Sequence, residues 1–238
     1  MNRNTLLDRS SLTARQLLFV ILFLNSLAIT VAITQAVILD KSPQFYFEEI
    51  GHGGYITVIS ALQLLITGVI SGLIFRIVKY TRKLHKTRFF WLIVALICLF
   101  LAVDDVLGIH ESLDRWFHNL LQLQVTELTD LVDDLIVGSY LIGFLIYVAC
   151  QWQVIQAFNP AFGWFKAGFI LAAVMVLLDI LSNNTLFISQ VIDDQALIRQ
   201  IREWLGVVED SAKIFAEGLF VVGVYHCRQI AKAHSNNS

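Results

Sequence analysis

The chain has 238 residues, of which 57% are hydrophobic and only 15% are charged, against about 25% charged residues in a typical soluble domain. This composition excludes a disordered chain. The net charge of −2 leaves no basic excess for binding nucleic acid, and three cysteines are too few for a disulfide scaffold. The remaining class is an integral membrane protein, and the lengths of the apolar segments test it.

A helix needs about 20 apolar residues to cross the hydrocarbon core of a bilayer. Four segments meet this condition clearly, and the last two are apolar apart from a few charged residues. The first segment is too long for the apolar core of a signal peptide, so we interpret it as a retained helix. The sequence therefore predicts an all-α transmembrane bundle, a single domain over residues 1–238, with spans at about 16–39, 55–78, 89–110, 132–156, 164–185 and 207–227.

The basic residues predict the orientation of this bundle. Twelve of the 17 lie before the first span, between spans two and three, between spans four and five, or after span six. Because Lys and Arg accumulate in cytoplasmic loops, we expect both termini in the cytoplasm of a bacterial cell and the protein in its plasma membrane. The acids show the opposite asymmetry, since Asp8 is the only one of 19 on the predicted cytoplasmic side.

Carboxylates and histidines are densest at the outer end of span three. Asp104 and Asp105 point about 100° apart on a helix, so one is expected to face the bundle and the other a neighbouring helix or water. Carboxylates combined with histidines suit zinc, iron or manganese. We therefore predict a divalent-metal site here with a contribution from span five, although no Glu-x-x-His pair is present. Its candidate ligands are Asp104, His110, Glu111, Asp114, His118 and Asp179.

The last span carries charged residues within apolar sequence. Glu217 lies about ten residues into the span, roughly 15 Å at 1.5 Å per residue, which places it near the midplane. Ionisable residues at this depth are costly and commonly functional. We predict that Glu217, Asp210 and Lys213 form a catalytic or polar site. The alternative is a structural ion pair between Lys213 and Glu217, four residues apart.

Two of these segments carry a resemblance. Residues 104–115 read Asp-Asp-x4-His-Glu-x2-Asp-Arg, and residues 209–213 read Glu-Asp-Ser-Ala-Lys. The pair resembles a pattern in uncharacterised bacterial membrane proteins, which carry Asp-Glu-x4-His-Glu on one span and a Glu-Glu-x-x-Lys-like segment on the last. The resemblance implies the six-span layout and no particular activity.

Three functions fit these observations. The first is a metal-dependent membrane enzyme that acts on a lipid-like or other hydrophobic small molecule. The second is a proton- or cation-coupled transporter or channel, whose path would follow a polar stripe on span two and use Glu217 as a deep relay. The third is a structural, assembly or sensing protein, in which the acids form caps and ion pairs. The polar stripe on span two consists of Ser60, Gln63, Thr67 and Ser71. For all three functions, membrane lipids are the expected partners.

Overall fold

The computed structural model describes residues 12–47, 54–109, 112–113, 116, 120, 131–183, 192 and 194–236. Within these residues the chain is helical and contains no strand. Six helices have 20 or more residues: α2 (Ala14–Ile38), α3 (Tyr55–Tyr80), α4 (Arg88–Leu107), α6 (Leu131–Cys150), α8 (Phe162–Asn183) and α10 (Gln195–Asn236). Shorter helical segments join them: η1 (Pro43–Tyr46), η3 (His85–Thr87), α7 (Trp152–Ile155) and η4 (Gln156–Ala161).

Local sequence explains several helix ends. Thr13 and Gln16 form a capping box at the start of α2, in which the Thr13 hydroxyl accepts a hydrogen bond from the Gln16 backbone. Helix α4 ends because Gly108 adopts a left-handed conformation with φ of 57°, which costs glycine little. Pro160 lies in η4, immediately before α8. Because of Gly108, α4 ends three residues earlier than the predicted span 89–110.

Within the part of the chain that the structure describes, four helical segments are long and apolar enough to cross a membrane: Ala14–Ile38, Tyr55–Tyr80, His85–Leu107 and Gln156–Ser182. Their outer surfaces remain apolar, as in α2, where Phe19 and Phe23 are 70% and 66% exposed. An apolar exterior of this kind is suited to lipid. The protein is therefore a helical membrane protein on the length and composition of these four segments.

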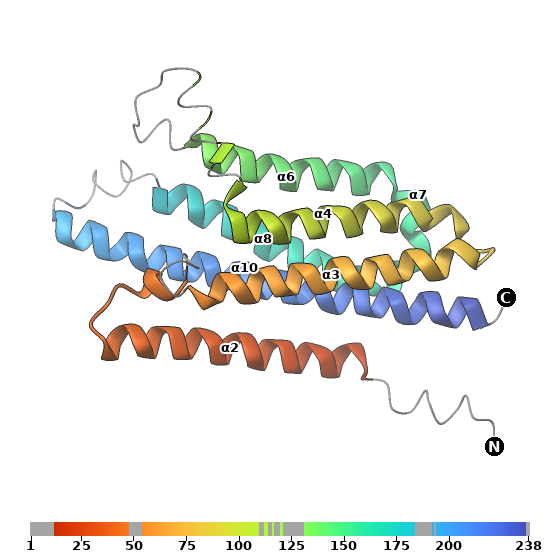
Figure 1. Cartoon of the computed structure of the whole chain (residues 1–238), viewed down its shortest axis with the longest axis horizontal. Helices are drawn as coiled ribbons and strands as arrows, with labels where there is room; N and C mark the ends of the chain where they lie inside the picture. The colour runs from red at the N-terminus through yellow and green to blue at the C-terminus, as the bar shows by residue number, and fades with distance from the viewer. Residues whose placement is uncertain are drawn as a thin grey trace.

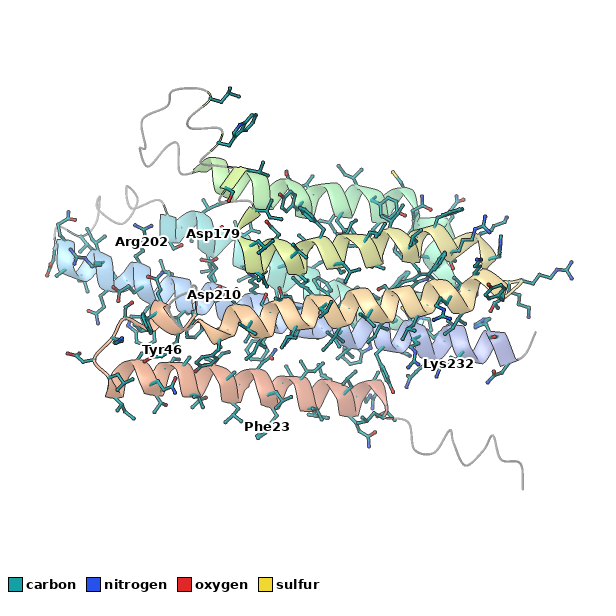
Figure 2. All side chains as sticks on the ribbon, in the orientation of Figure 1. Phe23, Tyr46, Asp179, Arg202, Asp210 and Lys232 are labelled. Carbon is teal, nitrogen blue, oxygen red and sulfur yellow. The ribbon has the colours of Figure 1, made fainter. Side chains whose placement is uncertain are left out.

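Successive long helices run in opposite directions, and α2 begins at the end of the bundle where α10 ends (Figure 1). We call this the basic end, because the α3–α4 connection there carries Arg82, Lys83 and Lys86. The opposite, acidic end contains Asp179 and Asp210, whereas Lys232 lies at the basic end (Figure 2). The separation of charge along the sequence is thus a separation along the bundle.

Helix α10 occupies the centre of the bundle and packs against α2, α3 and α8 (Figure 1). Although it is the most polar long helix, its middle third is largely buried. Glycines permit close approach on this helix: a Cβ on Gly218 would lie 2.5 Å from Ile21 Cγ2 of α2. The predicted span 207–227 covers only the apolar part of a helix that has 42 residues.

Two apolar clusters lie on either side of the middle of the bundle. The cluster nearer the acidic end joins α2, η1, α3 and α10, with Phe47 and Ile214 fully buried. The cluster at the basic end joins α3, α4, η4 and α10, and it includes Ile74, Trp91 and Phe158. The polar side chains described next lie between these clusters along α3 and α10.

Candidate functional site

A buried polar network connects α3, α4 and α10 in the acidic half of the bundle. Ser60 lies on the second turn of α3, Asp105 lies near the end of α4, and Lys213 and Glu217 lie one turn apart on α10. Ser60 and Glu217 are only 1% and 6% exposed. Three helices therefore place four polar side chains in one small, poorly hydrated volume.

The Lys213 ammonium forms an ion pair with Asp105, and the distance from Nζ to Oδ1 is 2.5 Å. The side chains of Lys213 and Asp105 are 27% and 10% exposed, so the network reaches the surface at this corner. Lys213 therefore pairs with an acid on a neighbouring helix. Among the described residues, its ion-pair partner is Asp105 and not Glu217, which was the alternative considered from the sequence.

The Ser60 hydroxyl contacts both carboxyl groups. Its Oγ lies within hydrogen-bonding distance of Asp105 Oδ2 and 2.8 Å from Glu217 Oε1. Glu217 Oε2, in contrast, is buried without a hydrogen-bond partner among the described residues. A chain of contacts thus runs from the ammonium of Lys213, through Asp105 and Ser60, to the carboxyl group of Glu217.

A second chain of hydrogen bonds fixes the orientation of the neighbouring amides. Asn25 Nδ2 donates to the backbone carbonyl of Ile214 at 2.8 Å, so Asn25 Oδ1 must act as an acceptor. Gln63 Nε2 donates to that Oδ1 at 2.7 Å. Gln63 must therefore present its oxygen on the other side, and Gln63 Oε1 is buried without a described partner. This position therefore adds one more buried acceptor to the interior.

The polar stripe predicted on span two is buried on one face of α3. Ser60, Gln63, Thr67 and Ser71 are all less than 9% exposed. The hydroxyls of Thr67 and Ser71 donate to backbone carbonyls one turn earlier on the same helix, at 2.9 and 2.8 Å. Below Ser71 the stripe ends, because Ile74 and Val78 belong to the apolar cluster at the basic end.

The structure brings two of the three predicted catalytic residues, Lys213 and Glu217, into this network. The third, Asp210, is half-buried one turn before Lys213, close enough to interact electrostatically with Lys213 and Asp105. Of the adjacent acids in α4, Asp105 joins the network, whereas the predicted metal ligand Asp104 is buried at 5% exposure outside the contacts described above.

The predicted metal site receives no support from the residues whose positions are described. Among them, no group of three His, Cys, Asp or Glu side chains could hold a metal ion. Asp179 lies on α8, where Ser182 donates to its backbone carbonyl and lies 3.5 Å from Glu209 Oε2 of α10. The other four candidate ligands, His110, Glu111, Asp114 and His118, lie outside the described residues.

Sequence reasoning did not assign Asp105 or Asn25 to the site, and it placed Gln63 only on the polar stripe of span two. Asn25 is the most instructive omission, because it is a side-chain amide within an otherwise apolar stretch of the first span. A buried amide needs partners, so its position signalled a contact with another polar residue. The sequence alone does not show which helix supplies that contact.

The fold and this network define a helical membrane protein with a charged, hydrogen-bonded interior. The chain belongs to the family described as "Domain of unknown function (DUF8692)", whose model matches residues 11–227. No curated protein and no solved structure matches the chain.

Proposed function

We propose that this protein is a membrane transporter or channel that moves protons, and that its proton site is formed by Ser60, Asp105, Lys213 and Glu217. The observation that carries the proposal is the position of Ser60 between two carboxyl groups. A hydroxyl has a single proton, so it can donate to only one of them. The other carboxyl must then donate to Ser60, which requires an additional proton in the network.

Glu217 is the carboxyl that holds this proton in our proposal. Asp105 forms the ion pair with the Lys213 ammonium, so we take it as the carboxyl that accepts a hydrogen bond from Ser60. Glu217 is more deeply buried than Asp105, and its Oε2 has no hydrogen-bond partner among the described residues. An ionised carboxylate in that position would be costly, and a protonated carboxyl that donates to Ser60 avoids this cost. Gln63 Oε1 is a further buried acceptor without a described partner, which likewise favours a proton or cation over an anion.

Access to the site supports loading from one side. Lys213 and Asp105 are partly exposed near the acidic end, whereas a packed apolar cluster closes the basic end. Two grooves, of about 320 and 700 Å³, open elsewhere on the bundle, and neither is lined by a residue of the network. A proton needs no cavity, whereas an organic substrate does, so a proton fits the network better.

We also propose six membrane crossings with both termini in the cytoplasm. The alternating directions of successive long helices between the two ends of the bundle support this topology, as does the accumulation of basic residues at one end (Figure 1). Cys150 tests it, because it is exposed at the basic end of α6, whereas Cys227 is buried. An impermeant maleimide should label inverted vesicles but not right-side-out vesicles. Cys150→Ser should abolish this labelling, and labelling of right-side-out vesicles would contradict the orientation.

The bound proton is tested by infrared spectroscopy of the purified protein. We expect the carbonyl band of a protonated carboxyl at neutral pH, and we expect Glu217→Gln to remove it. Glu203→Gln is the matched control, because Glu203 lies on the same helix about three turns before the network. A band that persists in Glu217→Gln would place the proton elsewhere and contradict the assignment.

Transport is tested in vesicles that contain a pH-sensitive dye. Wild-type protein should move protons when a membrane potential or pH gradient is imposed, and Glu217→Gln should reduce the rate to that of empty vesicles. Glu203→Gln should transport as wild type does. If wild-type protein moves no protons under any imposed proton or sodium gradient, the transport function is wrong, even if the infrared assignment holds.

A further inference from the structure

A groove of about 700 Å³ opens at the basic end of the bundle, between α2 and α8, with α10 as its floor. Arg15 of α2, Gly163 and Trp164 of α8, and Leu219 and His226 of α10 are among its lining residues. None of the ten lining residues is acidic. The groove is separate from the polar network, since the two share no residue.

Hydrogen bonding determines which groups the groove offers to a ligand. The indole Nε1–H of Trp164 donates to His226 Nδ1 at 3.4 Å. An indole nitrogen is only a donor, so Nδ1 must be the unprotonated ring nitrogen, and Nε2 carries the hydrogen. His226 therefore contributes a donor to the groove, in addition to the guanidinium of Arg15.

The start of α2 is held against α10, which keeps Arg15 at the groove. The hydroxyl of Tyr225 and the Nε2 of Gln229 both donate to the backbone carbonyl of Leu12, at 2.8 and 3.0 Å. Arg15 follows three residues later, on the first turn of α2. The cationic side of the groove is thus positioned by hydrogen bonds between α10 and Leu12, which precedes α2.

The remaining walls are apolar and open. Ala167 and Leu219 line the groove beyond its charged end, and a Cβ on Gly163 would meet no atom within 4 Å. Both α2 and α8 belong to segments long and apolar enough to face lipid. A ligand that places an anionic group near Arg15 and an apolar chain along Leu219 would match both parts of this surface.

We propose that the groove binds an anionic phospholipid, with its phosphate at Arg15 and His226 and an acyl chain along Ala167 and Leu219. Basic pockets between helices near a membrane interface are suited to anionic lipid headgroups. A guanidinium forms strong, charge-assisted hydrogen bonds with phosphate. The apolar wall distinguishes a lipid from a free phosphate ion, which would make no use of it.

Binding to the full chain in detergent, measured by native mass spectrometry, tests the proposal. Phosphatidylglycerol should bind more tightly than phosphatidylcholine, and Arg15→Gln should weaken phosphatidylglycerol binding about tenfold, as expected for loss of a hydrogen bond between charged groups. Arg82→Gln, at an exposed basic residue of the same end outside the groove, should bind as wild type does.

A second variant tests the groove without changing its charge. Gly163→Leu fills the open space, and it should block lipid binding, whereas Gly72→Leu on α3, where a Cβ also meets no atom, should have no effect. The proposal is overturned if phosphatidylcholine binds equally well and Arg15→Gln changes nothing. Unchanged binding to Gly163→Leu would place the lipid outside the groove. Binding of inorganic phosphate as tight as that of phosphatidylglycerol would make this a site for a free anion.

Discussion

The polar network at the acidic half of the bundle and the groove at the basic end have opposite hydrogen-bonding balances. In the network, Glu217 Oε2 and Gln63 Oε1 are buried acceptors without described partners, and Ser60 is shared by two carboxyl groups. In the groove, Arg15 and His226 offer donors, and no acid lines the wall. The network therefore has an excess of acceptors, and the groove has an excess of donors. Both regions nevertheless include residues of the same central helix, α10.

The regions also differ in packing, and this difference determines how each should respond to substitution. The network is enclosed by three helices, so an altered partner leaves a charge or polar group buried. The groove is open, so water or lipid can replace a lost contact. Changes in the network should therefore affect folding, whereas changes in the groove should affect binding.

The largest effect is expected from Lys213→Met. Without the ammonium, the mostly buried Asp105 loses its cation, and breaking a buried pair commonly costs 3–5 kcal/mol. Because Lys213 is 27% exposed, we expect a loss of about 3 kcal/mol, at the lower end of that range. Chemical unfolding in detergent measures it. The double variant Lys213→Met with Asp105→Leu should recover at least half of the lost stability. A loss below about 1 kcal/mol in the single variant would contradict the prediction, because it would show that water screens the ion pair.

A smaller effect is expected from Asn25→Leu, which leaves Gln63 Nε2 and the Ile214 carbonyl without their described partner. An unsatisfied buried polar group costs about 2 kcal/mol, and the same unfolding measurement detects it. Adding Gln63→Leu removes the stranded amide and should restore part of the stability. A double variant less stable than Asn25→Leu would mean that Gln63 has a role beyond its bond to Asn25.

Two glycines compare packing in the two regions directly. Gly218→Ala places a Cβ 2.5 Å from Ile21 Cγ2, and the displacement of α2 should cost about 1–2 kcal/mol. Gly163→Ala, in the open groove, should be neutral or slightly stabilising, because alanine favours a helix more than glycine does. Thermal unfolding of both variants measures the difference, and equal loss in both would contradict it.

The smallest effect on stability is expected from Trp164→Phe. This variant removes the donor to His226 Nδ1, a long and partly exposed hydrogen bond worth about 0.5 kcal/mol. Because His226 can then place its hydrogen on either nitrogen, phosphatidylglycerol binding should weaken while the unfolding midpoint hardly changes. A large loss of stability would show that the groove is as tightly packed as the network.

The helices were predictable because apolar length identifies a membrane-spanning segment with little dependence on context. The predicted ranges 16–39 and 55–78 lie within two residues of the ends of α2 and α3. Polar helical sequence was harder to place. Helix α10 begins at Gln195, well before the predicted residue 207. Its first three turns are polar, so a search for apolar segments did not include them.

The site was predictable in part for a different reason. Lys213 and Glu217 stood out as charges within an apolar segment, and such charges are rare enough to be informative. The choice between Asp104 and Asp105 depended on the rotation of α4 about its axis, which a single sequence does not specify. The metal site stays a prediction, because it relied on His110, Glu111, Asp114 and His118, which lie outside the described residues.

Helix α10 also gives the bundle a mechanical connection. Its 42 residues form one continuous helix of about 63 Å, and Glu217 and His226 are nine residues, about 14 Å, apart along it. A stiff rod cannot slide or turn at one of these positions while the other stays still. If α10 moves when Glu217 is protonated, it would therefore also move the floor of the proposed lipid groove, and the lipid composition of the membrane would then alter the free energy of protonation at the proposed proton site.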